Sequence, residues 1–151
     1  MLGRWRICAM VGLILASASL SAPTWAIQCA PYARSVSGLD LYGAAWKWWD
    51  EADGQYDRGR HPALGAAVVF KRVRGMPSGH VAIVTRIVNT RTIMVEHANW
   101  SPVHGRKGRV EKNAKVIDVS PKNDWSEVRV WYGPVHGVGN KVYPVYGFIY
   151  R

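Results

Sequence analysis

Residues 79–100 decide the fold, and they read GHVAIVTRIVNTRTIMVEHANW. Two runs rich in apolar and β-branched residues, 80–88 and 92–99, stand on either side of a short polar segment. Runs of this length and composition predict β-strands, and so short a connection predicts that they pair as an antiparallel hairpin. The first run contains Val81-Ala82-Ile83-Val84, the most apolar strand segment of the chain, which predicts a buried strand.

The hairpin brings polar side chains together at one end of the sheet. A two-residue turn within residues 89–91 can be placed in two ways, and both put His97 and Asn99 on the face that His80 occupies. Glu96 then points to the opposite face. A three-residue turn would bring Glu96 to the face of His80 instead, because a shift of one residue exchanges the two faces of a strand.

The rest of the chain supplies helices first and strands afterwards. Apolar residues after Cys29 repeat with a helical period up to the stop signal Gly38, and a second helix is predicted over about residues 41–52. The predicted strands are residues 66–72, 80–88, 92–99, 115–119, 128–132 and 145–150. The basic segment 101–112 is predicted to carry little regular structure. We therefore expect an α+β fold, with N-terminal helices packed on an antiparallel sheet of about five to six strands.

The N-terminus has the composition of an export signal. Arg4 and Arg6 precede an apolar run at residues 7–20, and Thr24-Trp25-Ala26 resembles a small-x-small cleavage site. We predict residues 1–26 to be a signal peptide and residues 27–151 to be one domain, periplasmic or extracellular, without a stable membrane anchor. The chain has 20 Lys and Arg residues against 10 Asp and Glu, a net charge of +10 that falls to +8 when the two signal arginines are removed.

Cysteine usage gives the strongest functional clue. The chain has two cysteines. Cys8 leaves with the predicted signal, so Cys29 has no partner for an intrachain disulfide in a compartment where disulfides normally form. A helix N-terminus favours a thiolate, and Cys29 is expected at such an end. A cysteine nucleophile needs a base, for which His80 is the candidate. The alternative role for Cys29 is that of a small buried residue on the helix.

In chain order, these segments resemble the CHAP family of cysteine- and histidine-dependent amidohydrolases and peptidases, within the NlpC/P60-like and papain-like hydrolases. The resemblance is carried by Gln28-Cys29-Ala30, by Pro62 and Gly65 before Val68-Val69-Phe70, by Gly79-His80-Val81-Ala82-Ile83-Val84 and by His97-Ala98-Asn99-Trp100. The strand 145–150 is similar to the family's closing strand, so the resemblance extends over essentially the whole predicted domain. The family commonly has Glu-x-Asn-Trp at the position where this chain has His97-Ala98-Asn99-Trp100. The identity of the third catalytic residue of this chain is therefore left open.

The resemblance implies a papain-like or NlpC/P60-like fold and cleavage of amide bonds in bacterial peptidoglycan. The bond is either the one joining sugar to stem peptide, as in N-acetylmuramoyl-alanine amidases, or one within the peptides and cross-bridges. The expected site residues are Cys29 as nucleophile, His80 as general base, His97, Asn99 or Glu96 as the third residue, Gln28 as an oxyanion donor, and Trp46 and Trp100 as substrate-binding residues. A Cys-His thioester mechanism needs no metal and no cofactor.

Two alternatives belong to other functional classes. A secreted basic binding module would use the charge and the tryptophans to hold envelope polymers or nucleic acid without chemistry. That alternative gives Cys29 and the Gly79-His80 junction no role, so we expect peptidoglycan rather than nucleic acid as the partner. The other alternative is a secreted amidase that acts on a substrate outside the cell wall.

Overall fold

The computed structural model describes residues 26–151, so the predicted signal peptide, apart from its last residue, lies outside the described residues. Three short helical segments come first: α1 (Cys29–Ser37), the 3-10 turn η1 (Ala45–Lys47) and α2 (Trp48–Glu51). The strands are β1 (Arg58–Gly59), β2 (Ala67–Phe70), β3 (His80–Asn89), β4 (Thr92–Ala98), β5 (Val110–Asp118), β6 (Glu127–Tyr132), β7 (Gly137–Val138) and β8 (Tyr143–Ile149), with a 3-10 turn η2 (Gly133–Val135) before β7.

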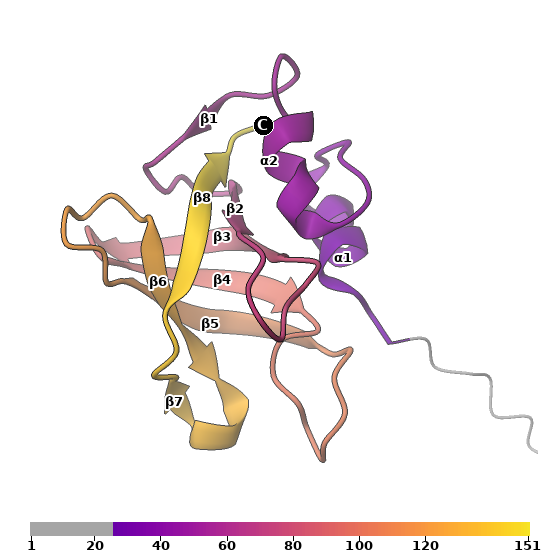
Figure 1. Cartoon of the computed structure of the whole chain (residues 1–151), viewed down its shortest axis with the longest axis vertical. Helices are drawn as coiled ribbons and strands as arrows, with labels where there is room; N and C mark the ends of the chain where they lie inside the picture. The colour runs from indigo at the N-terminus through magenta and orange to yellow at the C-terminus, as the bar shows by residue number, and fades with distance from the viewer. Residues whose placement is uncertain (1–25) are drawn as a thin grey trace, which may run out of the picture.

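The strands form a closed barrel with the helices on one side of it (Figure 1). Their order in the sheet is β1-β8-β2-β3-β4-β5-β6-β7, all pairs are antiparallel, and β8 also pairs with β6. This additional pairing closes β2, β3, β4, β5, β6 and β8 into a six-stranded ring, while β1 and β7 are two-residue extensions. The predicted α+β fold of the papain-like or NlpC/P60-like type is therefore wrong, and the domain is mostly β.

The correction has two physical causes. The helical period over residues 41–52 does not produce one helix, because Gly43 takes a left-handed φ of 72° and only Trp48–Glu51 is α-helical. The strands are more extensive than their apolar patterns indicate: β5 already begins at Val110, inside the segment predicted to be irregular. Closure depends on β8 pairing with β2 and β6 at once, and a local pattern carries no information about that contact.

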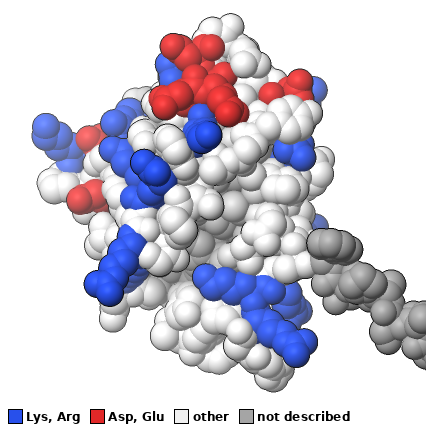
Figure 2. Space-filling view, turned by 45° about the vertical axis from the view of Figure 1, so that its right-hand side comes forward, with Lys and Arg blue, Asp and Glu red and all other residues white. Residues whose placement is uncertain are grey.

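Charged side chains are distributed unevenly over the face of the molecule that Figure 2 shows. Figure 2 shows Asp and Glu gathered mainly at the upper end of the visible face, with Lys and Arg in several groups over the rest of it. Within residues 26–151, no helix is long and apolar enough to span a membrane.

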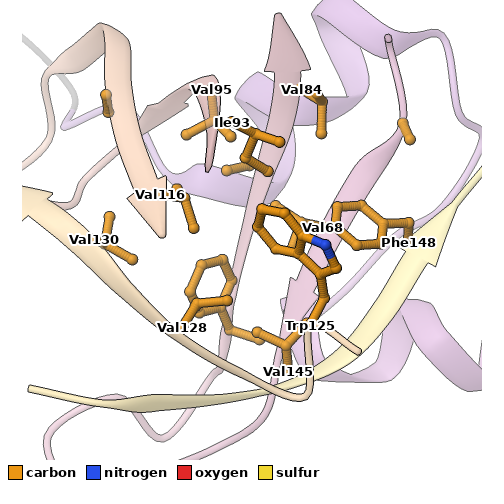
Figure 3. Close-up of a cluster of buried hydrophobic side chains, with 14 of the residues drawn as sticks. Val68, Val84, Ile93, Val95, Val116, Trp125, Val128, Val130, Val145 and Phe148 are labelled. Carbon is orange, nitrogen blue, oxygen red and sulfur yellow. The ribbon is translucent and has the colours of Figure 1, made fainter. Parts of the chain in front are cut away.

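The barrel interior is the larger of two apolar clusters. Figure 3 shows side chains from all six ring strands meeting there, among them Val68, Val84 and Val116. The second cluster lies on the outer face of β2 and β3, where Ala67, Val69, Val81 and Ile83 pack against α1, η1 and α2. Because apolar layers cover both faces, residues 80–84 are all buried, which is why this run is apolar without alternation.

The predicted hairpin is confirmed, and so is the prediction that His97, and not Glu96, shares a face with His80. Asn89 pairs with Thr92 across the turn, and after two irregularities Ile83 pairs with Glu96. Glu96 therefore shares the outer face with Ile83, whereas His80 and His97 lie on the inner face at one end of the barrel.

Candidate active site

Cys29 is the first residue of α1. Gln28 precedes it in an extended conformation and makes no side-chain cap, and Gly38 ends the helix in the left-handed conformation, as predicted. Ala30 and Ala33 are buried in the cluster shared with β3, which fixes the helix against the barrel. The half-buried Cys29 is thus held at the N-terminal end of α1, next to the beginning of β3.

The thiol of Cys29 is held in its protonated form. Burial raises its pKa above the ordinary value, although backbone hydrogen bonds from Val81, Ala30 and Cys29 itself lower it. The thiolate expected from the position of Cys29 at the helix N-terminus is therefore not favoured in the resting protein, because the loss of hydration outweighs the backbone hydrogen bonds. A base must remove the proton before the sulfur becomes a good nucleophile.

A glycine sets the position of His80 at the start of β3. Gly79 has a φ of 64°, and a Cβ atom there would lie 2.7 Å from the Phe70 carbonyl oxygen and 2.9 Å from the Trp46 Cβ. Only glycine fits this turn without displacing backbone. The turn delivers His80 into β3 opposite Phe70, where its ring meets the Phe70 ring edge-on at 5.4 Å.

His97 is the side chain whose ring nitrogen lies within hydrogen-bond distance of His80. The Nε2 atom of His80 lies 3.0 Å from the Nδ1 atom of His97, and both rings are almost completely buried. Burial lowers the pKa of His80 well below its ordinary value, and the nearby His97 and Lys107 lower it further. His80 is therefore neutral around pH 7, as a general base must be.

Asn99 and Glu96 make other contacts. Asn99 follows β4 with a left-handed φ of 62°, and its Nδ2 donates to the Gln28 Oε1 at 2.8 Å. Glu96, on the outer face, accepts a hydrogen bond from the Tyr32 hydroxyl at 2.9 Å. Of the three candidates for the third residue, only His97 has a hydrogen bond to His80 among the described contacts.

One pocket of about 670 Å³ joins these residues. Its lining includes Gln28, Cys29, His80, Asn99 and Trp100. Trp100 is buried, and its ring packs 4.7 Å from that of His80, so it forms the pocket wall. Trp46 does not line the pocket and instead stacks with the Arg72 guanidinium at 4.1 Å.

Glu111 and the position of Lys107 at the pocket were not predicted from the sequence. Glu111 pairs with His97 in the β4–β5 ladder, and Lys107 lines the pocket. A strand prediction starting at Val110 would have placed Glu111 in β5, but its pairing with His97 depends on an irregularity in the ladder. In residues 26–151, no group of three or more His, Cys, Asp or Glu side chains has a geometry suited to a metal ion.

Comparison with known families agrees with this arrangement. A family model, the CHAP domain, matches residues 19–99, which is more than half of the chain. The chain belongs to the CHAP family. The match contains every predicted site residue of this CHAP protein except Trp100, and it ends before β5, so it does not extend over the whole domain. No curated protein matches the chain.

Family membership establishes the general class of activity. CHAP domains are generally hydrolytic, as amidases or peptidases, and membership indicates a function like that of peptidoglycan hydrolases. The bond that is cleaved and the role of each residue belong to the proposal that follows.

Proposed function

We propose that this CHAP protein hydrolyses amide bonds of bacterial peptidoglycan, with Cys29 as nucleophile and His80 as general base. The observation that carries the proposal is that Cys29 and His80 line the same pocket, while the buried His97 contacts the Nε2 atom of His80. The contact between His80 Nε2 and His97 leaves Nδ1 as the ring nitrogen available to a proton. A structural cysteine would need neither a neutral histidine nor a pocket beside it.

The reaction begins with both groups uncharged. His80 takes the thiol proton as the Cys29 sulfur attacks the substrate carbonyl carbon, and the imidazolium then protonates the leaving amine. A thioester joins Cys29 to the acyl part of the substrate. Water, deprotonated by His80, attacks this thioester, releases the carboxylic acid and returns the proton to the thiol.

Gln28 and the start of α1 are suited to stabilise the oxyanion. Because the Gln28 Oε1 accepts the hydrogen bond from Asn99, its Nε2 hydrogens are left for the substrate oxygen. The Cys29 backbone N–H is a second donor, since the first N–H groups of a helix have no partner within it. Donors of this kind each contribute about 10²- to 10³-fold to kcat. Asn99 thus contributes by orienting the side-chain amide of Gln28.

Basic residues of the pocket suit a substrate that carries carboxylates. Lys107 and Lys141 both line it, and Lys141 also lies 5.1 Å from the ring of Tyr143. Stem peptides bear free carboxylates, which such lysines attract. We therefore propose the peptide part of peptidoglycan as the occupant of the pocket, and export through the signal peptide as the route that brings the enzyme to it.

The test is digestion of purified peptidoglycan followed by mass analysis of the soluble products. Release of whole stem peptides identifies an amidase, and release of shortened peptides identifies an endopeptidase. His104→Ala is the matched control variant and should give the same products as the wild type, because His104 is exposed and does not line the pocket. Binding to the polymer without any new product would contradict the proposal and favour a binding module, whereas neither binding nor product would favour a substrate outside the wall.

A further inference from the structure

The carboxylate of Glu111 lies next to His97, on the side of the ring that faces away from His80. Glu111 is the second residue of β5, and its Cα pairs with that of His97. Its Oε2 is 3.3 Å from the His97 Nε2 and accepts the Ser101 backbone N–H at 2.9 Å. Among the described residues, the buried His97 Nε2 makes no aligned hydrogen bond, and the Glu111 carboxylate is the acceptor that lies next to it. Glu111 is outside the pocket lining and beyond the residues that match the family.

An irregularity in the β4–β5 ladder brings Glu111 to this place. Val95 pairs with Ala114, but the next pair is His97 with Glu111, so β5 contains one more residue than β4 between them. Asn113, in the extra segment, has a left-handed φ of 55°, a conformation that occurs in one type of β-bulge. A regular ladder would have paired His97 with Lys112. The bulge therefore places an acidic residue, rather than a basic one, opposite His97.

The three side chains lie in a row, with His97 between His80 and Glu111, and the chemistry of their facing atoms determines which nitrogens carry hydrogens. An ionised carboxylate only accepts, so the Nε2 of His97 carries the hydrogen and its Nδ1 accepts from the Nε2–H of His80. The Nδ1 of His80 is then without a hydrogen. Burial alone would raise the pKa of Glu111, but hydrogen bonds from His97 and Ser101 lower it below its ordinary value, which keeps the group ionised.

We propose that Glu111 is a positioning residue that fixes the tautomers of His97 and His80 and stabilises the positive charge that His80 gains. It acts through His97 and touches neither the substrate nor the thiol. This inference rests on the proposed function for its effect on turnover, but the tautomers themselves can be measured in the resting protein.

The first test is NMR of the imidazole nitrogens in the full domain. In the wild type, both His80 and His97 are expected as the Nε2–H tautomer. Glu111→Leu, which removes the acceptor, should change the tautomer of His97, whereas Glu96→Leu, on the outer face of β4, should not. Unchanged tautomers in Glu111→Leu would overturn the proposal. Because this readout needs no substrate, its failure is distinct from a failure of the proposed hydrolase activity.

The second test uses Glu111→Gln, which keeps the shape and a carbonyl acceptor but removes the charge. It should lower kcat at least about tenfold, because the charge on His80 is less well stabilised. KM should be unchanged, since Glu111 does not line the pocket. A kcat within twofold of the wild type would overturn the proposal, and this variant also serves if the leucine variant does not fold. Glu96→Gln is the matched control.

Discussion

At the scale of single residues, the site depends on two groups that burial makes neutral. Burial raises the pKa of the Cys29 thiol and lowers the pKa of His80, so at pH 7 the resting pair is a thiol and an imidazole rather than an ion pair. The base must therefore remove the proton during the attack. This explains why the orientation of His80 by His97 matters as much as the position of the sulfur.

The low pKa of His80 predicts the pH dependence of the reaction. Activity requires neutral His80, so initial rates at low substrate concentration should fall on the acid side only well below pH 6.5. Lys107 contributes to this low pKa by its positive charge, and removing that charge raises the pKa. The acid limb of Lys107→Ala should therefore lie at higher pH than that of the wild type.

Lys112→Ala is the control for this measurement. The ammonium of Lys112 is exposed and lies 4.0 Å from the Glu96 carboxylate on the outer face, so its removal should leave the acid limb in place. The midpoint of the limb is compared rather than the rate, because Lys107 also lines the pocket. An identical midpoint in Lys107→Ala and the wild type would show that His80 does not control the limb.

At the scale of elements, the sequence predicted the parts nearest the site better than the fold around them. The helix from Cys29 to Gly38 and the hairpin of β3 and β4 follow from local signals, namely a glycine stop and two apolar runs with a short turn. The barrel does not, because its closure depends on pairing between distant strands. Glu111 was missed for a related reason, since a bulge decides which residue of β5 faces His97.

The turn before β3 can be tested by Gly79→Ala. The added Cβ would clash with the backbone oxygen of Phe70 and would need a left-handed conformation, so His80 should shift and the free energy of unfolding should fall by more than about 2 kcal/mol. Gly105→Ala is the control: its φ of 74° imposes the same conformation, but nothing lies within 4 Å of its Cβ. Denaturant unfolding should show a clearly larger loss for Gly79→Ala, and equal losses would contradict the role of the clash.

At the scale of the whole molecule, the barrel and the helices each supply different residues of the site. The barrel end supplies His80, His97 and Glu111, whereas α1, packed on the outside of β3, supplies Cys29 and is preceded by Gln28 (Figure 1). The nucleophile and its base thus belong to different layers, joined by the apolar cluster between α1 and β3. A small CHAP domain can hold this arrangement with two short helices.

Digestion of purified peptidoglycan by Cys29→Ala, compared with the wild type and His104→Ala, tests the central claim most directly. The sulfur forms the covalent bond, so removing it should lower the rate of product release by at least about 10³-fold. Circular dichroism and unfolding of the same samples must show that the variant is folded, as expected for a half-buried side chain. Product release by folded Cys29→Ala at the wild-type rate would contradict the account.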